Sequence, residues 1–204
     1  MTKTTRRLPV LTETSIAETK ALRLSLAQNY QLQLQSRTDT ISCRPGCHNC
    51  CRHPVYLSLL EGVLTYRAIV KQGKWLTLKP KLIDVSKRTW GLSSEVWAMS
   101  DLACPLLEDG LCAIYEARPF SCHVAYSVGS PDNCRPVRFD GSFLPKTPMI
   151  ELFSKEESTI LQKHKTRLFR LPLASATLWG ERIDQGTLAL EDFFGAIVKE
   201  PSNG

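Results

Sequence analysis

No window of this chain approaches the eighteen or so consecutive apolar residues that a membrane-spanning helix requires, and residues 1–15 are too polar for a signal peptide. The phosphate-binding loop and the GxGxxG, HExxH and GxSxG motifs are absent, which argues against nucleotide-dependent and common hydrolytic chemistry. The H-x-E and P-C-x-x-C segments of zinc deaminases are missing as well. These absences predict a cytoplasmic protein without a membrane partner, and no catalytic residue is identified.

The chain nevertheless has the composition of an ordinary folded protein. Its 204 residues are 43% hydrophobic and 23% charged, which is enough to bury one sizeable core. No internal repeat, Ser/Gly-rich linker or low-complexity segment marks a boundary. The sequence therefore predicts a single domain over residues 1–204.

The unusual feature is a set of eight cysteines, all between residues 43 and 134. They form two groups, C-x3-C-x2-C-C and C-x7-C-x9-C-x11-C, at Cys43, Cys47, Cys50 and Cys51, and at Cys104, Cys112, Cys122 and Cys134. An even number of cysteines is also typical of a disulfide framework, but such frameworks belong to exported chains, and nothing here directs export. Metal binding is the better interpretation.

The first group has the spacing of a metal-binding loop. Cys47 and Cys50 can turn toward one ion because Pro45-Gly46 favours a turn just before them, and Cys43 can supply a third ligand. Cys51 points to a second centre or to the other group, because neighbouring side chains usually diverge. All-thiolate sites suit zinc or an iron–sulfur cluster such as [4Fe-4S], and eight cysteines would fill two of them. His48, His53 and His123 lie beside the cysteines and are alternative ligands in a zinc site.

The segments around the cysteines favour helices. Residues 13–37 are predicted as a helical arm, with a capping box at Ser15-x-x-Glu18 and one apolar face at Leu22, Leu26, Tyr30 and Leu34. Further capping boxes at Ser58-x-x-Glu61 and Ser154-x-x-Glu157 predict a helix that continues through Leu59, Val63, Tyr66 and Val70 to Gly73, and a helical part over residues 150–200. Its last helix is predicted from Leu188, Leu190, Phe193, Phe194, Ile197 and Val198.

The second cysteine group begins with a predicted β-hairpin. Glu108-Asp109-Gly110 separates two short apolar runs, and this turn would bring Cys104 and Cys112 to the same end. Arg118-Pro119 then ends any helix begun at Tyr115 and returns the chain toward Cys122. The predicted fold class is mainly α with a small β-hairpin element (α+β), a cysteine-rich domain stabilised by metal over residues 43–134.

The chain is also basic, with a formal net charge of +6. The six cations Lys71, Lys74, Lys79, Lys81, Lys87 and Arg88 accompany a single acid, Asp84. We interpret this segment as a solvated surface, and a zinc-stapled module that binds nucleic acid or a protein partner is the alternative. Each filled four-thiolate site carries a net charge of −2, so two filled sites would lower +6 to +2 and weaken the argument for nucleic acid.

The cysteine-containing segments CRPGCHNCC and CPLLEDGLCAIYEARPFSC resemble the YkgJ-like cysteine-cluster family, a zinc- or iron-chelating CxxCxxCC domain, over about residues 43–125. The residues of the second segment that fall on the family pattern are Cys104, Pro105, Leu106, Leu107, Gly110, Cys112, Ile114, Tyr115, Arg118, Pro119 and Cys122. His123 departs from the pattern, which has arginine at this position. Cys134 lies beyond the resemblance.

The resemblance implies metal ligation by the matching cysteines. Arg118 and His123 are the predicted cofactor-binding residues beside them; the guanidinium would offset thiolate charge, or else form an ordinary surface salt bridge. One branch of the family, the flagellin lysine methylases, is associated with an iron–sulfur cluster, so an iron–sulfur-dependent modification enzyme is an alternative function. The triad Cys43, Cys47 and Cys50 also has the spacing of radical S-adenosylmethionine enzymes, but the sequence lacks their strand–helix alternation.

Overall fold

The computed structural model describes residues 11–36, 41, 43–44, 46–126, 130, 134, 148–164 and 168–187. The α-helices in this part of the chain are α1 (Glu13–Gln35), α2 (Leu59–Lys71), α3 (Trp75–Thr89), α4 (Ser94–Met99), α5 (Phe120–Val124), α6 (Pro148–Lys163) and α7 (Leu173–Asp184). The strands are β1 (Tyr56–Ser58), β2 (Leu107–Glu108), β3 (Leu111–Cys112) and β4 (Arg170–Pro172), and two 3-10 turns are η1 (Asn49–Arg52) and η2 (Tyr115–Ala117). The chain is mainly α with small β elements, as predicted.

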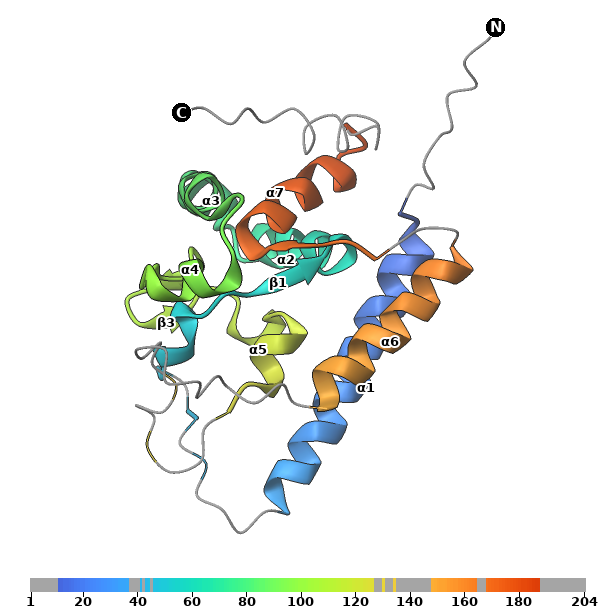
Figure 1. Cartoon of the computed structure of the whole chain (residues 1–204). Coiled ribbons are helices and arrows are strands. Elements are labelled where there is room, and N and C mark those ends of the chain that lie inside the picture. Colours follow the sequence, from blue (N-terminus) through green and yellow to red (C-terminus); the bar gives the residue numbers. More distant parts are fainter. Residues whose placement is uncertain are drawn as a thin grey trace, which may run out of the picture.

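Helices α2 and α7 form the centre of the fold (Figure 1). Strands β1 and β4 pair antiparallel, with Leu57 opposite Leu171, and each strand leads directly into one of the two helices. This short ladder therefore fixes where α2 and α7 begin. Helix α3 packs on α7, and its apolar face buries Leu78, Leu82 and Val85 in the largest core cluster.

Helix α3 was not predicted. Its residues fall in the basic segment, where alternating lysines obscure the apolar positions Leu78, Leu82 and Val85, although these recur at helical spacing. The exposed side of the helix carries the cations, so the segment is both a surface and part of the core. None of the described helices is long and apolar enough to cross a membrane.

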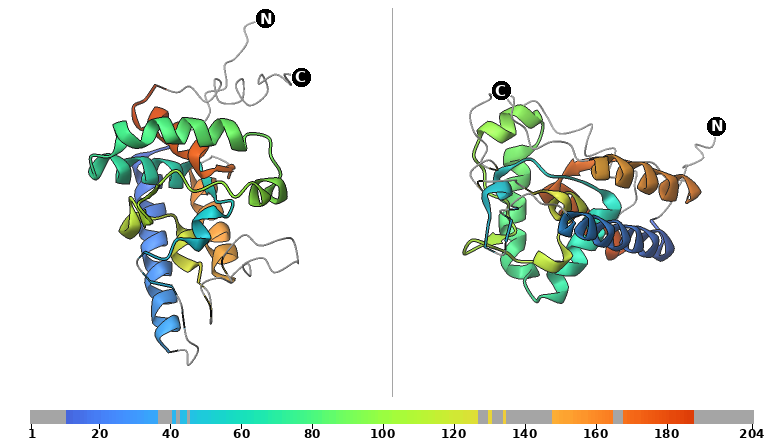
Figure 2. Two further views of the ribbon diagram at one scale, coloured as in Figure 1. Left: turned by 90° about the vertical axis from the view of Figure 1, so that its left-hand side faces the viewer. Right: turned by 90° about the horizontal axis from the view of Figure 1, so that it is seen from below.

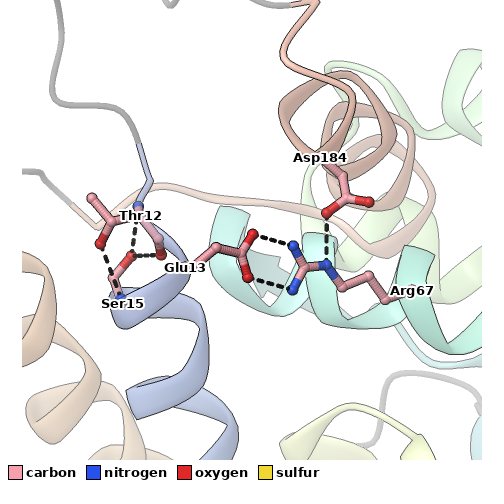
Figure 3. A network of polar contacts seen from close by, with 5 residues as sticks. All are labelled: Thr12, Glu13, Ser15, Arg67 and Asp184. Atoms are coloured by element: carbon pink, nitrogen blue, oxygen red, sulfur yellow. Dashed lines mark hydrogen bonds and ion pairs between the residues drawn. The ribbon is translucent and has the colours of Figure 1, made fainter.

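Helices α1 and α6 run side by side and pack against each other (Figures 1 and 2). Tyr30 is buried and Leu22, Leu26 and Leu34 are partly buried in one core cluster, so the predicted apolar face of α1 is confirmed. The predicted capping box is wrong, because Thr12 is the N-cap and its hydroxyl accepts a hydrogen bond from the Ser15 amide at 3.1 Å. Ser15 therefore lies inside the first turn (Figure 3).

An ion-pair network ties the start of α1 to the central helices (Figure 3). Arg67 of α2 donates from Nη1 to Glu13 at 3.0 Å and from Nε to Asp184 of α7 at 2.6 Å. Three helices that are distant in the sequence thus meet at one guanidinium. The contact is largely exposed, so it orients the helices more than it stabilises them.

The other two predicted capping boxes have different outcomes. Ser58 is the N-cap of α2 and accepts from the Glu61 amide at 3.1 Å, but the Glu61 carboxylate accepts from Phe120 at the start of α5 rather than returning to the cap. Ser154 is not a cap, because α6 already begins at Pro148. Ser154 lies within the helix, and its hydroxyl donates to the Ile150 carbonyl.

The predicted apolar face of α2 differs at one position. The side chain of Val70 is exposed, contrary to prediction.

Several boundaries differ from the predicted ones at the C-terminal end. Leu161 is buried on α6, whereas Leu168 and Leu171 lie beyond that helix, and Leu171 belongs to β4. The helix predicted from Leu188 to Val198 falls outside the described residues. The single domain over residues 1–204 stays a prediction for the same reason.

Glu157 of α6 is fully buried, and its charge should make stability depend on pH. Burial and, after it, the charge of Glu61 raise its pKa to about 8. Because the folded pKa lies above the unfolded value of 4.5, this group's contribution to stability is fully present below about pH 4.5 and is lost as the pH rises toward 8. We expect Glu157→Gln to remove much of this loss, on the order of 3 kcal/mol at pH 8.

Urea unfolding of the metal-free protein at several pH values measures this effect. Glu151→Gln is the matched control, because Glu151 is exposed on the same helix. A Glu157→Gln variant whose free energy of unfolding keeps the wild-type pH dependence would show that the buried carboxyl is not its source.

Candidate metal centre

The β2–β3 hairpin holds Cys104 and Cys112 close together. Its turn places Asp109 and Gly110 at φ values of 50° and 78°, the left-handed conformation that an Asp-Gly hairpin turn requires. Leu107 pairs with Cys112, and the Leu107 amide donates to the Cys104 carbonyl at 3.0 Å. Leu106 and Ile114 anchor the hairpin in the main core, where both are 2% exposed. The predicted hairpin is confirmed.

Helix α5 supplies Cys122. The chain leaves η2 at Arg118 and Pro119, as predicted, and re-enters helix at Phe120. Phe120 stacks on Phe153 of α6, with ring centroids 4.5 Å apart, and its amide donates to the buried carboxylate of Glu61 at 2.9 Å. Both contacts fix the start of α5, so the position of Cys122 two residues later is well determined.

The first cysteine group meets the second through the main chain. Cys50 and Cys51 lie in the 3-10 turn η1, and the Cys104 amide donates to the Cys51 carbonyl at 2.7 Å. On the hairpin, Gly110 lies against the ring of His48: a Cβ at this glycine would be 3.5 Å from His48 Nδ1. Segments about fifty residues apart are therefore joined at the cysteines.

Four thiols form a cluster at this junction: Cys50, Cys104, Cys112 and Cys122. Every pair of them is close enough for the charge of one thiolate to raise the pKa of the other. A side-chain hydrogen bond with Cys51 is the main cause that raises the pKa of Cys50, whereas burial is the main cause for the other three and raises the pKa of Cys122 to about 12. These four sulfurs are therefore protonated at neutral pH unless a cation compensates them.

Arg118 lies beside this cluster. Its positive charge lowers the pKa values of Cys50, Cys112 and Cys122, which places the guanidinium near three of the four sulfurs. The guanidinium carbon is 4.2 Å from the centre of the Tyr115 ring, and the buried Nε has no hydrogen-bond partner among the described residues. A buried donor without a partner at a thiol cluster fits a group that carries negative charge once metal is bound.

His123 supports Arg118. Burial is the main cause that lowers the pKa of His123 to about 4, followed by the charges of Arg118 and Arg23, so the ring is neutral at pH 7. The ring is hydrogen-bonded to the backbone of Arg118. That His123 takes part in binding the cofactor stays a prediction.

The remaining cysteines and histidines have other neighbours. Cys43 is exposed and its thiol donates to the Ala125 carbonyl at 3.9 Å, while Cys134 is buried and its carbonyl accepts from His53 Nε2 at 2.8 Å. Cys47 and Cys51 are partly buried in the loop and in η1. His48 Nδ1 bonds to the Gly46 carbonyl at 3.2 Å. Whether all eight cysteines are ligands stays a prediction.

The donor set fits a soft metal, although the described side chains are not arranged as a coordination shell. Among the described residues, no three Cys, His, Asp or Glu side chains gather closely enough to hold an ion. The four clustered sulfurs nevertheless come from η1, the hairpin and α5, and Arg118 supplies positive charge beside them. Zinc and iron–sulfur clusters are the centres that such thiolates prefer.

The basic segment offers less free charge than its sequence indicates. Lys74 and Lys81 lie at 2.8 and 3.6 Å from the carboxylate of Glu108, and Lys79 lies at 2.8 Å from that of Glu181. Arg88 pairs with Asp84 at 3.6 Å. Four of the six cations therefore have an acidic partner, which favours the interpretation as an ordinary surface.

Comparison with known proteins agrees with the cysteine pattern. A family model described as "Putative zinc- or iron-chelating domain" (CxxCxxCC) matches residues 42–143, which is half of the chain and includes Cys134. Searches of the curated proteins and of the solved structures found no match. The match extends the resemblance beyond residue 125 to all eight cysteines. The chain belongs to the YkgJ-like CxxCxxCC family of zinc- or iron-chelating domains.

Proposed function

We propose that Cys50, Cys104, Cys112 and Cys122 form one four-thiolate centre, and that holding this centre is the protein's central function. The observation that supports the choice of these four is that each thiol interacts electrostatically with the other three. The hairpin is anchored in the hydrophobic core, η1 is joined to it by a main-chain hydrogen bond, and the start of α5 is held by the bond from the Phe120 amide to Glu61. A centre built on such segments would stabilise the fold as well as bind metal.

Zinc or an iron–sulfur cluster of the [4Fe-4S] type would occupy the centre. Zinc would bind four thiolates in a closed tetrahedral site, whereas a cluster would add electron transfer. Anaerobic purification followed by zinc, iron and sulfide analysis and Mössbauer spectroscopy separates the two. Brown protein that absorbs at about 400 nm, with stoichiometric iron and sulfide, indicates a cluster; colourless protein with only zinc indicates a structural site. A chain that carries neither metal when purified and takes up neither would refute the proposal.

Arg118 would supply the positive charge nearest to the centre. We expect Arg118→Met to weaken metal binding about 10- to 100-fold, the loss typical of groups that support metal ligands without binding the metal. Competition with a chelator measures the affinity. Arg182→Met is a matched control, since Arg182 also lies over an aromatic ring, at 5.2 Å from the centre of the Trp179 ring, but belongs to α7. Equal metal affinity in both variants would show that Arg118 does not support metal binding.

The alternatives are tested on the same protein. An iron–sulfur-dependent modification enzyme requires an open iron position, so S-adenosylmethionine should perturb the spectrum of its cluster. A nucleic-acid-binding module requires affinity that falls steeply with salt. We favour neither: the described sheets are two short antiparallel pairs rather than a βα barrel, and most cations of the basic segment are paired.

A further inference from the structure

A buried group of charged side chains lies between α1, α2 and α6, next to α5. Its acids are Glu61 of α2, which is 2% exposed, and Glu157 of α6, which is fully buried. Arg23 of α1 is 5% exposed, and Arg170 of β4 lies at 3.5 Å from Glu157. Ser58 also donates to Glu157. Such a group is rare inside a protein, because each buried charge requires compensation.

Glu61 connects this group to the cysteine cluster. Its carboxylate accepts the hydrogen bond from the amide of Phe120, the first residue of α5, and Cys122 follows two residues later. Helix α5 also packs against both α1 and α6. The position of Cys122 therefore depends on the hydrogen bond at Glu61 and on the packing of α5.

Arg23 lies near both acids and near Cys122 of the cluster. Glu61, Cys122 and Glu157, in this order, are the negative groups near enough to raise its pKa against the effect of burial. Its Nε and Nη1 atoms are buried and have no hydrogen-bond partner among the described residues. A guanidinium keeps its charge in proteins, so Arg23 is a buried cation with unused donors.

The carboxylates do not fully compensate Arg23. Arg170 is a second cation beside the same acids, at 3.5 Å from Glu157, and burial raises the pKa of both Glu61 and Glu157, which disfavours their charged forms. A four-thiolate centre around zinc or an oxidised [4Fe-4S] core carries a net charge of −2. Filling the centre at Cys122 would provide the missing negative charge.

We propose that Arg23 is a positioning residue of the metal centre: it supplies positive charge near Cys122 in addition to that of Arg118, and Glu61 connects it to the segment that carries Cys122. The inference rests on the four-thiolate centre proposed above. It gives the N-terminal helix a part in metal binding, although this helix lies outside the family match at residues 42–143.

Zinc titration of the reduced full chain, in competition with a chelator, tests the inference. We expect Arg23→Met to bind zinc about 10- to 100-fold more weakly than wild type, and Arg23→Lys, which keeps the charge, to recover most of the affinity. Arg67→Met is the matched control, because Arg67 also joins α1 and α2 through carboxylates but contacts Glu13 and Asp184 instead. Its zinc affinity should equal that of wild type.

Circular dichroism of each metal-free variant separates metal binding from folding. A folded Arg23→Met variant with wild-type zinc affinity would overturn the inference, even if it unfolds more readily. So would a folded Arg23→Lys variant that binds zinc as weakly as Arg23→Met. If Arg23→Met does not fold, the wild-type chain decides: zinc should shift the NMR signal of the Arg23 Nε–H group, assigned through the α1 backbone, and an unmoved signal would overturn the inference.

The proposed function fails in a different way. In that case the wild-type chain itself would bind no zinc and no cluster, or would bind zinc equally well without the four clustered cysteines. Wild-type binding through these cysteines, combined with unchanged affinity in Arg23→Met, would refute only the role of Arg23.

Discussion

Replacing Cys104 by serine is expected to abolish the metal centre, with a loss of metal affinity of more than about 100-fold. The expected loss exceeds that of a supporting residue such as Arg118, because Cys104 would donate a sulfur to the metal itself. Its thiol lies against the main core and interacts with the three other thiols of the cluster. Serine keeps the approximate size of the side chain but is a poor ligand for a soft metal.

Metal content after purification and the rise in unfolding temperature on metal binding measure this effect. Cys43→Ser is the control, since Cys43 is exposed in the loop before η1 and its thiol donates to the Ala125 carbonyl. We expect this variant to retain the centre. If Cys104→Ser keeps its metal while Cys43→Ser loses it, the first cysteine group holds the metal instead.

Gly62→Ala should destabilise the fold by about 3 kcal/mol or more, the upper part of the range for overpacked cores. A Cβ at Gly62 would lie 2.2 Å from the carbonyl oxygen of Ala176, and a Cβ at Gly180 would lie 2.5 Å from the backbone of Gly62. Because these neighbours are main-chain atoms, α2 and α7 would have to separate. In an ordinary helix the same change stabilises the fold by roughly 1 kcal/mol. A loss of stability in Gly62→Ala would therefore indicate that α2 and α7 are in close contact.

Urea unfolding of the metal-free protein measures the free energy of this change. Gly73→Ala is a suitable control, because a Cβ there meets no atom within 4 Å and the only cost is its left-handed φ of 68°. We expect that variant to lose about 1 kcal/mol. Equal losses at Gly62 and Gly73 would mean that α2 and α7 are not in close contact at the glycines.

Local signals in the sequence were sufficient for much of the fold. The Asp109-Gly110 pair predicted the hairpin, and the spacing of Leu22, Leu26, Tyr30 and Leu34 predicted the buried face of α1. The cysteine spacing predicted the family. In each case the interacting residues are close in the chain, or the residue type is rare enough to mark its own function.

Local sequence signals of this kind could not predict the long-range contacts. Glu61 has the sequence position of a capping residue, but its carboxylate bonds to Phe120, fifty-nine residues later, so only the tertiary structure shows its role. Ser154 resembles an N-cap although α6 begins at Pro148. Arg23 did leave a signal, since it falls on the same helical face as the buried Ile16, Thr19 and Tyr30. Arg23 is the one charged residue among the buried positions of α1.

The grouping of the cysteines is also a tertiary property. Sequence spacing separates four cysteines from the other four, whereas the structure combines Cys50 of the first group with Cys104, Cys112 and Cys122 of the second. The junction depends on the hydrogen bond between the Cys104 amide and the Cys51 carbonyl. Nothing in the local pattern around either residue indicates this bond.

One measurement tests the central claim most directly: X-ray absorption spectroscopy of a variant in which Cys43, Cys47, Cys51 and Cys134 are all serine. We expect one metal centre per chain with only sulfur from the protein in its first shell, at about 2.3 Å if the metal is zinc. A variant that folds but binds no metal, or that holds it through nitrogen and oxygen, would contradict a centre formed by Cys50, Cys104, Cys112 and Cys122.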